Sequence, residues 1–94
     1  MQKSFASVEL ADGTTFDEVR VTVQDKLQYE RTARVKKWPE VQSNMFTFGA
    51  FVAWHATKRE GLHSLSWEDF EKQAVDAMVK TEGEDDGDGD LTQS

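Results

Sequence analysis

Residues 45–54 read MFTFGAFVAW and form a long apolar stretch near the middle of the chain. At about 100° per residue, the large apolar side chains of this stretch point to most sides of a helix instead of forming one stripe. A helix that is apolar all round lies at the centre of its domain or is covered by a partner. The stretch therefore predicts a central helix from about Met45 to Glu60, closed by Gly61.

Upstream of this helix, residues 4–21 have the pattern of a two-stranded antiparallel hairpin. Ser4 to Leu10 alternates loosely between two faces, and Thr15 to Val21 is β-branched and roughly alternating. Asp12-Gly13 lies between these segments and favours a tight turn, because both positions tolerate positive φ. A two-stranded hairpin is marginally stable alone, so we expect it to pack on the helices.

Two more helices are predicted, one on each side of the central helix in the sequence. A capping box at Thr22 begins a helix expected from about Val23 to Lys37, which the following Trp-Pro pair ends. Ser66 is the clearest N-cap, and the helix after it is expected from Trp67 to about Lys80. The predicted fold class is therefore α+β: an N-terminal two-stranded antiparallel β-hairpin packed on three α-helices.

The formal charge of −7 is distributed unevenly along the chain. Residues 81–94 contain six acids and no base, whereas residues 1–80 contain twelve acids and eleven bases, a net charge of −1. The C-terminal segment combines glycines with carboxylates and cannot bury enough surface to offset its ordering entropy. We therefore predict a single compact domain over residues 1–80 and a disordered acidic tail over residues 81–94.

Several classes of protein are disfavoured by composition. The chain has no cysteine, which suits a reducing compartment. We find no signal peptide, and no apolar run approaches the roughly 18 residues that a membrane span needs. The mixed charges of the domain form no basic stripe for nucleic acid. We expect a cytoplasmic protein that binds neither membranes nor nucleic acid.

Patterns typical of catalysis or metal binding are missing from the sequence. His55 and His63 are the only histidines, and they form no ligand cluster at metal spacing. The alternating acids of the tail resemble a calcium loop, but the chain ends before the bidentate Glu that an EF-hand requires. No segment assembles an acid, a base and a nucleophile. We therefore expect no enzymatic activity, no cofactor and no metal site.

Two features indicate where a partner could bind. The central helix has more aromatic side chains than one stripe holds: either the domain buries them all, or a partner covers some of them, and complete burial is difficult in a small domain. In the preceding helix, two arginines interrupt an apolar stripe. Such arginines either lay their stems along apolar surface or pair with carboxylates of a neighbouring subunit. The candidate partner-binding residues are Phe46, Phe48, Phe51, Trp54, Arg31, Arg34 and Trp38.

The order of these segments resembles a known family. After the Asp-Gly hairpin come LQYERTAR at 27–34, WP at 38–39, FVAWHA at 51–56, KREG at 58–61, SWEDF at 66–70 and the acidic tail. This order is similar to that of the small tail assembly chaperones of long-tailed, siphovirus-type bacteriophages, particularly those that infect actinobacteria. The resemblance covers essentially the whole chain, although no single motif in it is diagnostic.

The resemblance implies a function. Proteins of this family bind the long, aggregation-prone tape measure protein in the host cytoplasm, keep it soluble and help to recruit tail tube subunits. They are absent from the finished virion. Many are also made in a longer form by ribosomal frameshifting, and the acidic tail would then link the domain to the extension. A chaperone that coats a long client is also expected to form a homo-oligomer.

Two other functions remain open at this point. The protein could be a head–tail connector or another phage morphogenesis component that stays in the particle. It could also be an acidic inhibitor of a host nucleic-acid enzyme. The charge distribution disfavours the inhibitor, because a nucleic-acid mimic needs acids patterned over its folded surface and here they are concentrated in the tail.

Overall fold

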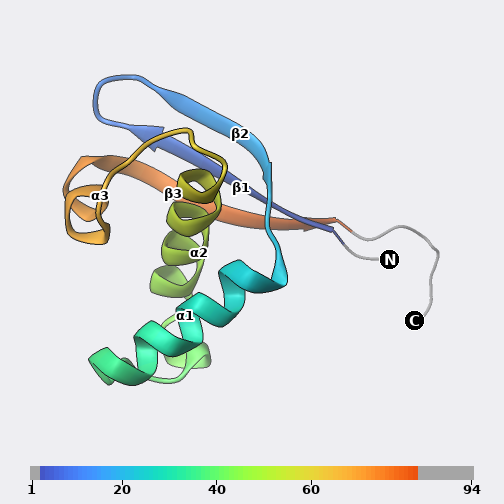
Figure 1. Ribbon diagram of the computed structural model, residues 1–94, viewed down its shortest axis with the longest axis vertical. Helices are drawn as coiled ribbons and strands as arrows, with labels where there is room; N and C mark the ends of the chain where they lie inside the picture. The colour runs from blue at the N-terminus through green and yellow to red at the C-terminus, as the bar shows by residue number, and fades with distance from the viewer. Residues whose placement is uncertain (1–2, 83–94) are drawn as a thin grey trace.

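A computed structural model describes residues 3–82 of the chain (Figure 1). The elements follow one another as β1 (Lys3–Leu10), β2 (Thr15–Arg20), α1 (Val23–Lys36), a 3-10 helix (Val41–Ser43), α2 (Met45–Arg59), α3 (Trp67–Gln73) and β3 (Ala74–Glu82). The three strands form one antiparallel sheet in the order β2-β1-β3. The fold class is α+β, as predicted.

The predicted hairpin is present as β1 and β2, but its turn is longer than the Asp-Gly pair. The turn occupies Ala11 to Thr14, and of these residues Gly13 alone has a positive φ, 92°. Asp12 acts through its side chain instead: its Oδ1 accepts a hydrogen bond from the Thr14 N–H at 2.9 Å. Glycine is therefore required at one position of the turn, and the aspartate stabilises it by an Asx-type hydrogen bond.

The prediction of a helix from Trp67 to Lys80 is wrong in its second half. α3 ends at Gln73, and the chain continues directly as β3, which pairs antiparallel with β1. The apolar residues after Gln73 fit helical spacing, but they alternate between two faces equally well. Tertiary pairing decides between the two, because β1 is the central strand and its second edge needs hydrogen-bond partners. The hairpin is thus part of a three-stranded sheet, which is more stable than two strands alone.

β3 includes Thr81 and Glu82, so the described structure extends past the boundary predicted between domain and tail. The antiparallel pairing brings Glu82 opposite Lys3, at the first residue of β1. The predicted disorder of the remaining acidic residues, 83–94, lies outside the described residues.

Three predicted helix ends are confirmed in the structure. Thr22 is extended, and its backbone N–H donates to the carboxylate of Asp25 at 2.8 Å, as expected in a capping box. At the other end of α1, Lys37 adopts a left-handed conformation with φ of 58°. Ser66 caps α3, because its Oγ accepts the N–H of Asp69 at 3.1 Å.

α2 lies between the sheet and α1 (Figure 1). It packs mainly on β3 and β1, and α1 packs on it from another side. Val52, Ala53 and Ala56 of α2 are fully buried, and Ala6 and Val8 of β1 lie in the same core. The predicted central helix is therefore confirmed.

Candidate interaction surfaces

Most of the aromatic side chains predicted as partner contacts pack against one another inside the domain. Phe51 is 2% exposed, and Phe48, Trp54 and Trp38 are partly buried around it. Neighbouring ring centroids are 4.9–6.2 Å apart, with mostly tilted or edge-to-face geometry. The domain itself therefore buries Phe51 and covers part of Phe48, Trp54 and Trp38. The cluster also includes Tyr29 and Trp67.

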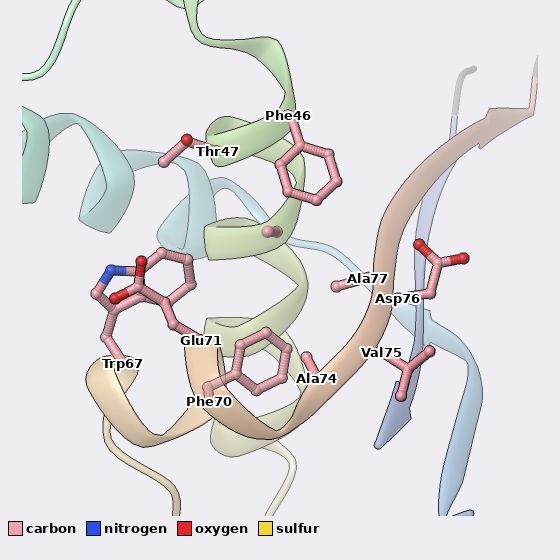
Figure 2. A pocket seen from close by; sticks show the side chains of 10 residues that line it. Phe46, Thr47, Trp67, Phe70, Glu71, Ala74, Val75, Asp76 and Ala77 are labelled. Atoms are coloured by element: carbon pink, nitrogen blue, oxygen red, sulfur yellow. The ribbon is translucent and has the colours of Figure 1, made fainter. Parts of the chain in front are cut away.

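Phe46 lies outside this aromatic cluster. Phe46 is 77% exposed, and Met45 beside it is 66% exposed. Phe46 stands at the rim of a hollow of about 160 Å³ between α2, α3 and β3 (Figure 2). Trp67 and Phe70 line the hollow from α3. Apolar surface that the domain does not cover is therefore gathered between the first turn of α2 and β3.

The outer face of α1 forms a second exposed apolar surface. Val23, Leu27 and Val35 are 71%, 42% and 81% exposed, and Arg31 is exposed between the last two. These four residues follow one another at four-residue spacing, so they form one ridge along the helix. We call this set the α1 ridge. It contains Arg31, one of the two arginines predicted to contact a partner.

The second arginine borders a different feature. Arg34 is exposed and lines a shallow groove of about 300 Å³ at the end of α1. Trp38 and Val41 lie along the same groove. The structure therefore separates the predicted contacts into an exposed set on α1, a single exposed aromatic on α2 and a buried aromatic cluster.

A buried charge cluster around Asp25 joins β2, α1 and α2, and only the capping role of Asp25 was predicted from the sequence. Asp25 is fully buried. Its Oδ1 accepts a hydrogen bond from His55 Nδ1 at 2.6 Å and another from Arg59 Nε at 3.0 Å. Its Oδ2 accepts one from Arg59 Nη2 at 3.1 Å and one from the Thr22 N–H at 2.8 Å. Arg59 also donates to the Arg20 carbonyl at the end of β2, at 2.8 Å. His55 and Arg59 lie 30 and 34 residues from Asp25, too far along the chain for a local pattern to reveal them.

The charge cluster keeps its carboxylate ionised. Burial of Asp25 opposes ionisation, but the hydrogen bonds from Arg59, Thr22 and His55 outweigh it and hold the pKa of Asp25 below its usual value of 3.8. The hydrogen bonds that Arg59 donates to the same carboxylate raise the pKa of Arg59 above its usual value. Because these bonds join the start of α1 to the end of α2, they fix the position of α1 and hold its ridge outward.

His63 is held as a neutral imidazole in the loop after α2. Its Nδ1 accepts the N–H of Leu65 at 3.1 Å and therefore carries no proton. The Thr57 hydroxyl donates to main-chain carbonyls of α2, so His63 Nε2–H is the donor in its 2.8 Å bond to Thr57 Oγ1. Burial and the nearby charge of Lys58 lower the pKa of His63 below its usual value of 6.5. Both nitrogens thus have structural partners.

The described part of the chain offers surfaces for binding and no metal centre. Within residues 3–82, no group of three His, Cys, Asp or Glu side chains could hold a metal ion. None of the helices in this range is long and apolar enough to cross a membrane. No protein-family model, curated protein or solved structure matches the chain.

Proposed function

We propose that this protein is a tail assembly chaperone of a long-tailed bacteriophage. It binds the tape measure protein in the host cytoplasm, keeps it soluble, helps to recruit tail tube subunits and leaves before the virion is complete. It acts by binding, without catalysis. The order of segments along the chain supports this proposal, and the α1 ridge supplies a surface suited to the client.

The observation that carries the proposal is the exposure of the α1 ridge. A row of side chains at i, i+4, i+8 and i+12 is the ridge that packs into the groove of another helix. Val23, Leu27 and Val35 supply apolar contacts, and Arg31 lies between them with a long apolar stem. The client therefore presents an amphipathic helix, which lays its apolar face along α1.

Charge on α1 favours an acidic client segment. Between residues 26 and 37 the helix and its cap contain five bases and one acid, Glu30. One of the bases, Lys36, is 3.8 Å from Glu68 of α3. Arg31 and Arg34 are exposed on the outer side, where guanidinium groups pair well with carboxylates. Such rim charges set the orientation of the client and raise its rate of association.

The test is co-expression of the full chain with the tape measure protein of the same phage, followed by a solubility assay and a pull-down. We expect the client to become soluble and to co-purify. Leu27→Asp, on the α1 ridge, is expected to abolish co-purification. Leu62→Asp is the matched control, since Leu62 is 43% exposed in a loop and Leu27 is 42% exposed. An insoluble client with the wild-type chain would overturn the proposal.

Mass spectrometry of purified virions separates this function from that of a connector. A chaperone is expected to be missing from particles that contain the tube and tape measure proteins. Stoichiometric recovery of the chain in such particles would instead identify a structural component.

A further inference from the structure

β3 has an open edge. In the order β2-β1-β3, one edge of β3 pairs with β1, and within residues 3–82 no strand pairs with the other edge. The open edge spans nine residues, Ala74–Glu82, and contains no proline. A long edge strand without proline is a template for pairing with another strand.

The pairing with β1 determines which way the β3 side chains point. Ala77 lies opposite Val8, which is buried beneath α2, and Val79 shares this face. Figure 2 shows Ala77 on the α2 side of the strand and Asp76 on the opposite side. The face away from α2 therefore carries Asp76, Met78 and Lys80.

We propose that β3 of one copy pairs antiparallel with β3 of a second copy, with Met78 opposite Met78. In this register, Asp76 of each copy lies opposite Lys80 of the other, and Ala77 lies opposite Val79. If Ala77 or Val79 instead of Met78 lay opposite its own copy, both charge pairs would be lost. If Asp76 or Lys80 lay opposite its own copy, like charges would face each other. The strand is thus self-complementary in one register, which joins two sheets in one continuous sheet with α2 of both copies on the same face.

Carboxylates across the sheet face that points away from α2 favour this partner. Asp76 lies opposite Glu9 in the β1–β3 pair, and Asp17 of β2 lines a shallow hollow together with both of them. Like charges directly opposite each other destabilise a sheet. The second copy would bring its Lys80 next to Asp76; within one copy, Lys80 is exposed and lies 3.6 Å from Glu82. Because of this charge complementarity, a second copy of the chain fits the open edge better than an unrelated strand does.

Exposed apolar side chains border the same edge. Val75 and Met78 of β3 are 63% and 50% exposed. Phe46 stands across the hollow between α2, α3 and β3 from the strand (Figure 2). α2 packs mainly on β3, so its layer covers the sheet up to this edge. Val79 of the second copy would lie beside Ala77, next to the hollow. Pairing therefore removes apolar surface that a single copy leaves in water.

This interface does not depend on the proposed client, because the client surface lies on α1 and the self-pairing surface lies on β3. A failure of one proposal leaves the other standing, and separate experiments test them.

The first test uses the absence of cysteine from the chain. Met78→Cys would place two thiols opposite each other, since directly opposite Cα atoms are about 4.5–5.5 Å apart and a disulfide accepts this distance. Thr81→Cys is the matched control on the same strand, because the two substituted residues would be about 20 Å apart. We expect Met78→Cys to form cross-linked dimers at least about tenfold faster under mild oxidation. Equal rates, or no cross-linking, would overturn the register.

The second test is a charge exchange measured by sedimentation velocity of the full chain. Asp76→Lys or Lys80→Asp alone sets like charges opposite each other twice per dimer and is expected to raise the dimer dissociation constant about tenfold or more. The double variant restores opposite charges and is expected to restore the dimer. Glu30→Lys, on α1, makes the same change in net charge as Asp76→Lys and is its control.

A wild-type chain that sediments as a monomer at every concentration would overturn the proposal, as would a double variant no better than the single ones. A monomeric chain whose β3 variants lose an unrelated co-purifying protein would reassign the edge to that protein. If a single charge variant fails to fold by circular dichroism, the cysteine pair decides the outcome.

Discussion

Asp25→Asn tests the buried charge cluster, and its cost follows from the contacts. The carboxylate accepts five hydrogen bonds, from Thr22, His55 and Arg59. Asparagine keeps one acceptor oxygen, and its NH₂ group faces donors that it cannot satisfy. Removing one partner of a buried ion pair costs about 3–5 kcal/mol. The side chains of His55 and Arg59 are 21% and 23% exposed, so water partly compensates them, and we expect the lower end, about 3 kcal/mol.

The assay is urea unfolding at neutral pH, followed by circular dichroism, with thermal melting as a second measure. A loss of about 3 kcal/mol lowers the Tm of a domain of this size by about 12–24 °C. Glu30→Gln removes the same charge from an exposed site on the same helix and is expected to change stability by less than about 0.5 kcal/mol. Arg59→Gln is expected to lower the free energy of unfolding less in the Asp25→Asn variant than in the wild-type chain, because the ion pair is already lost there. A loss below about 1 kcal/mol for Asp25→Asn would refute the reasoning.

Three further predictions concern stability. Because folding lowers the pKa values of His63 and Asp25, the free energy of unfolding is expected to decrease as pH falls, first below about 6.5 and then below about 3.8. Urea unfolding at a series of pH values measures this decrease, and a constant free energy of unfolding down to about pH 5 would contradict the His63 assignment. Phe51→Ala is expected to lower the free energy of unfolding of the monomer by about 3–5 kcal/mol, and Phe46→Ala by less than about 0.5 kcal/mol, as measured by chemical unfolding. Equal losses would contradict the burial of Phe51 and the exposure of Phe46. Lys37→Gly is expected to add about 0.5 kcal/mol, since glycine adopts the left-handed conformation without strain; a lower Tm would contradict this.

The sequence predicted the features that depend on local interactions. The caps at Thr22 and Ser66 and the turn glycine at 13 each act within three or four residues, and their chemistry is specific to residue type. The central position of α2 was also predictable, because a helix with apolar residues on every side has few other places to lie.

The features that were missed depend on partners far away in the chain. Residues 74–80 fit a helix and a strand equally well, and what selects the strand is the free edge of β1, about 70 residues earlier. The exposure of Phe46 and the burial of Phe51 differ for the same reason: both belong to one apolar helix, and the positions of the sheet and α3 decide which side chain is covered. Asp25 was identifiable as a cap, but its pairing with Arg59 is a tertiary contact.

The buried charge cluster also explains how α1 keeps its position while exposing an apolar ridge. Only Asp25 and Tyr29 of this helix are fully buried, so hydrophobic burial alone holds it weakly. The hydrogen bonds that Asp25 accepts from His55 and Arg59 of α2 supply the missing constraint, since they are satisfied in one orientation of the two helices. A helix fixed in this way does not rotate to bury its apolar ridge in the core, so the ridge stays free for a client. Replacing Asp25 is therefore expected to weaken client binding more than an equally destabilising change at Phe70 of α3, because Asp25 holds the orientation of the α1 ridge and Phe70 belongs to another helix.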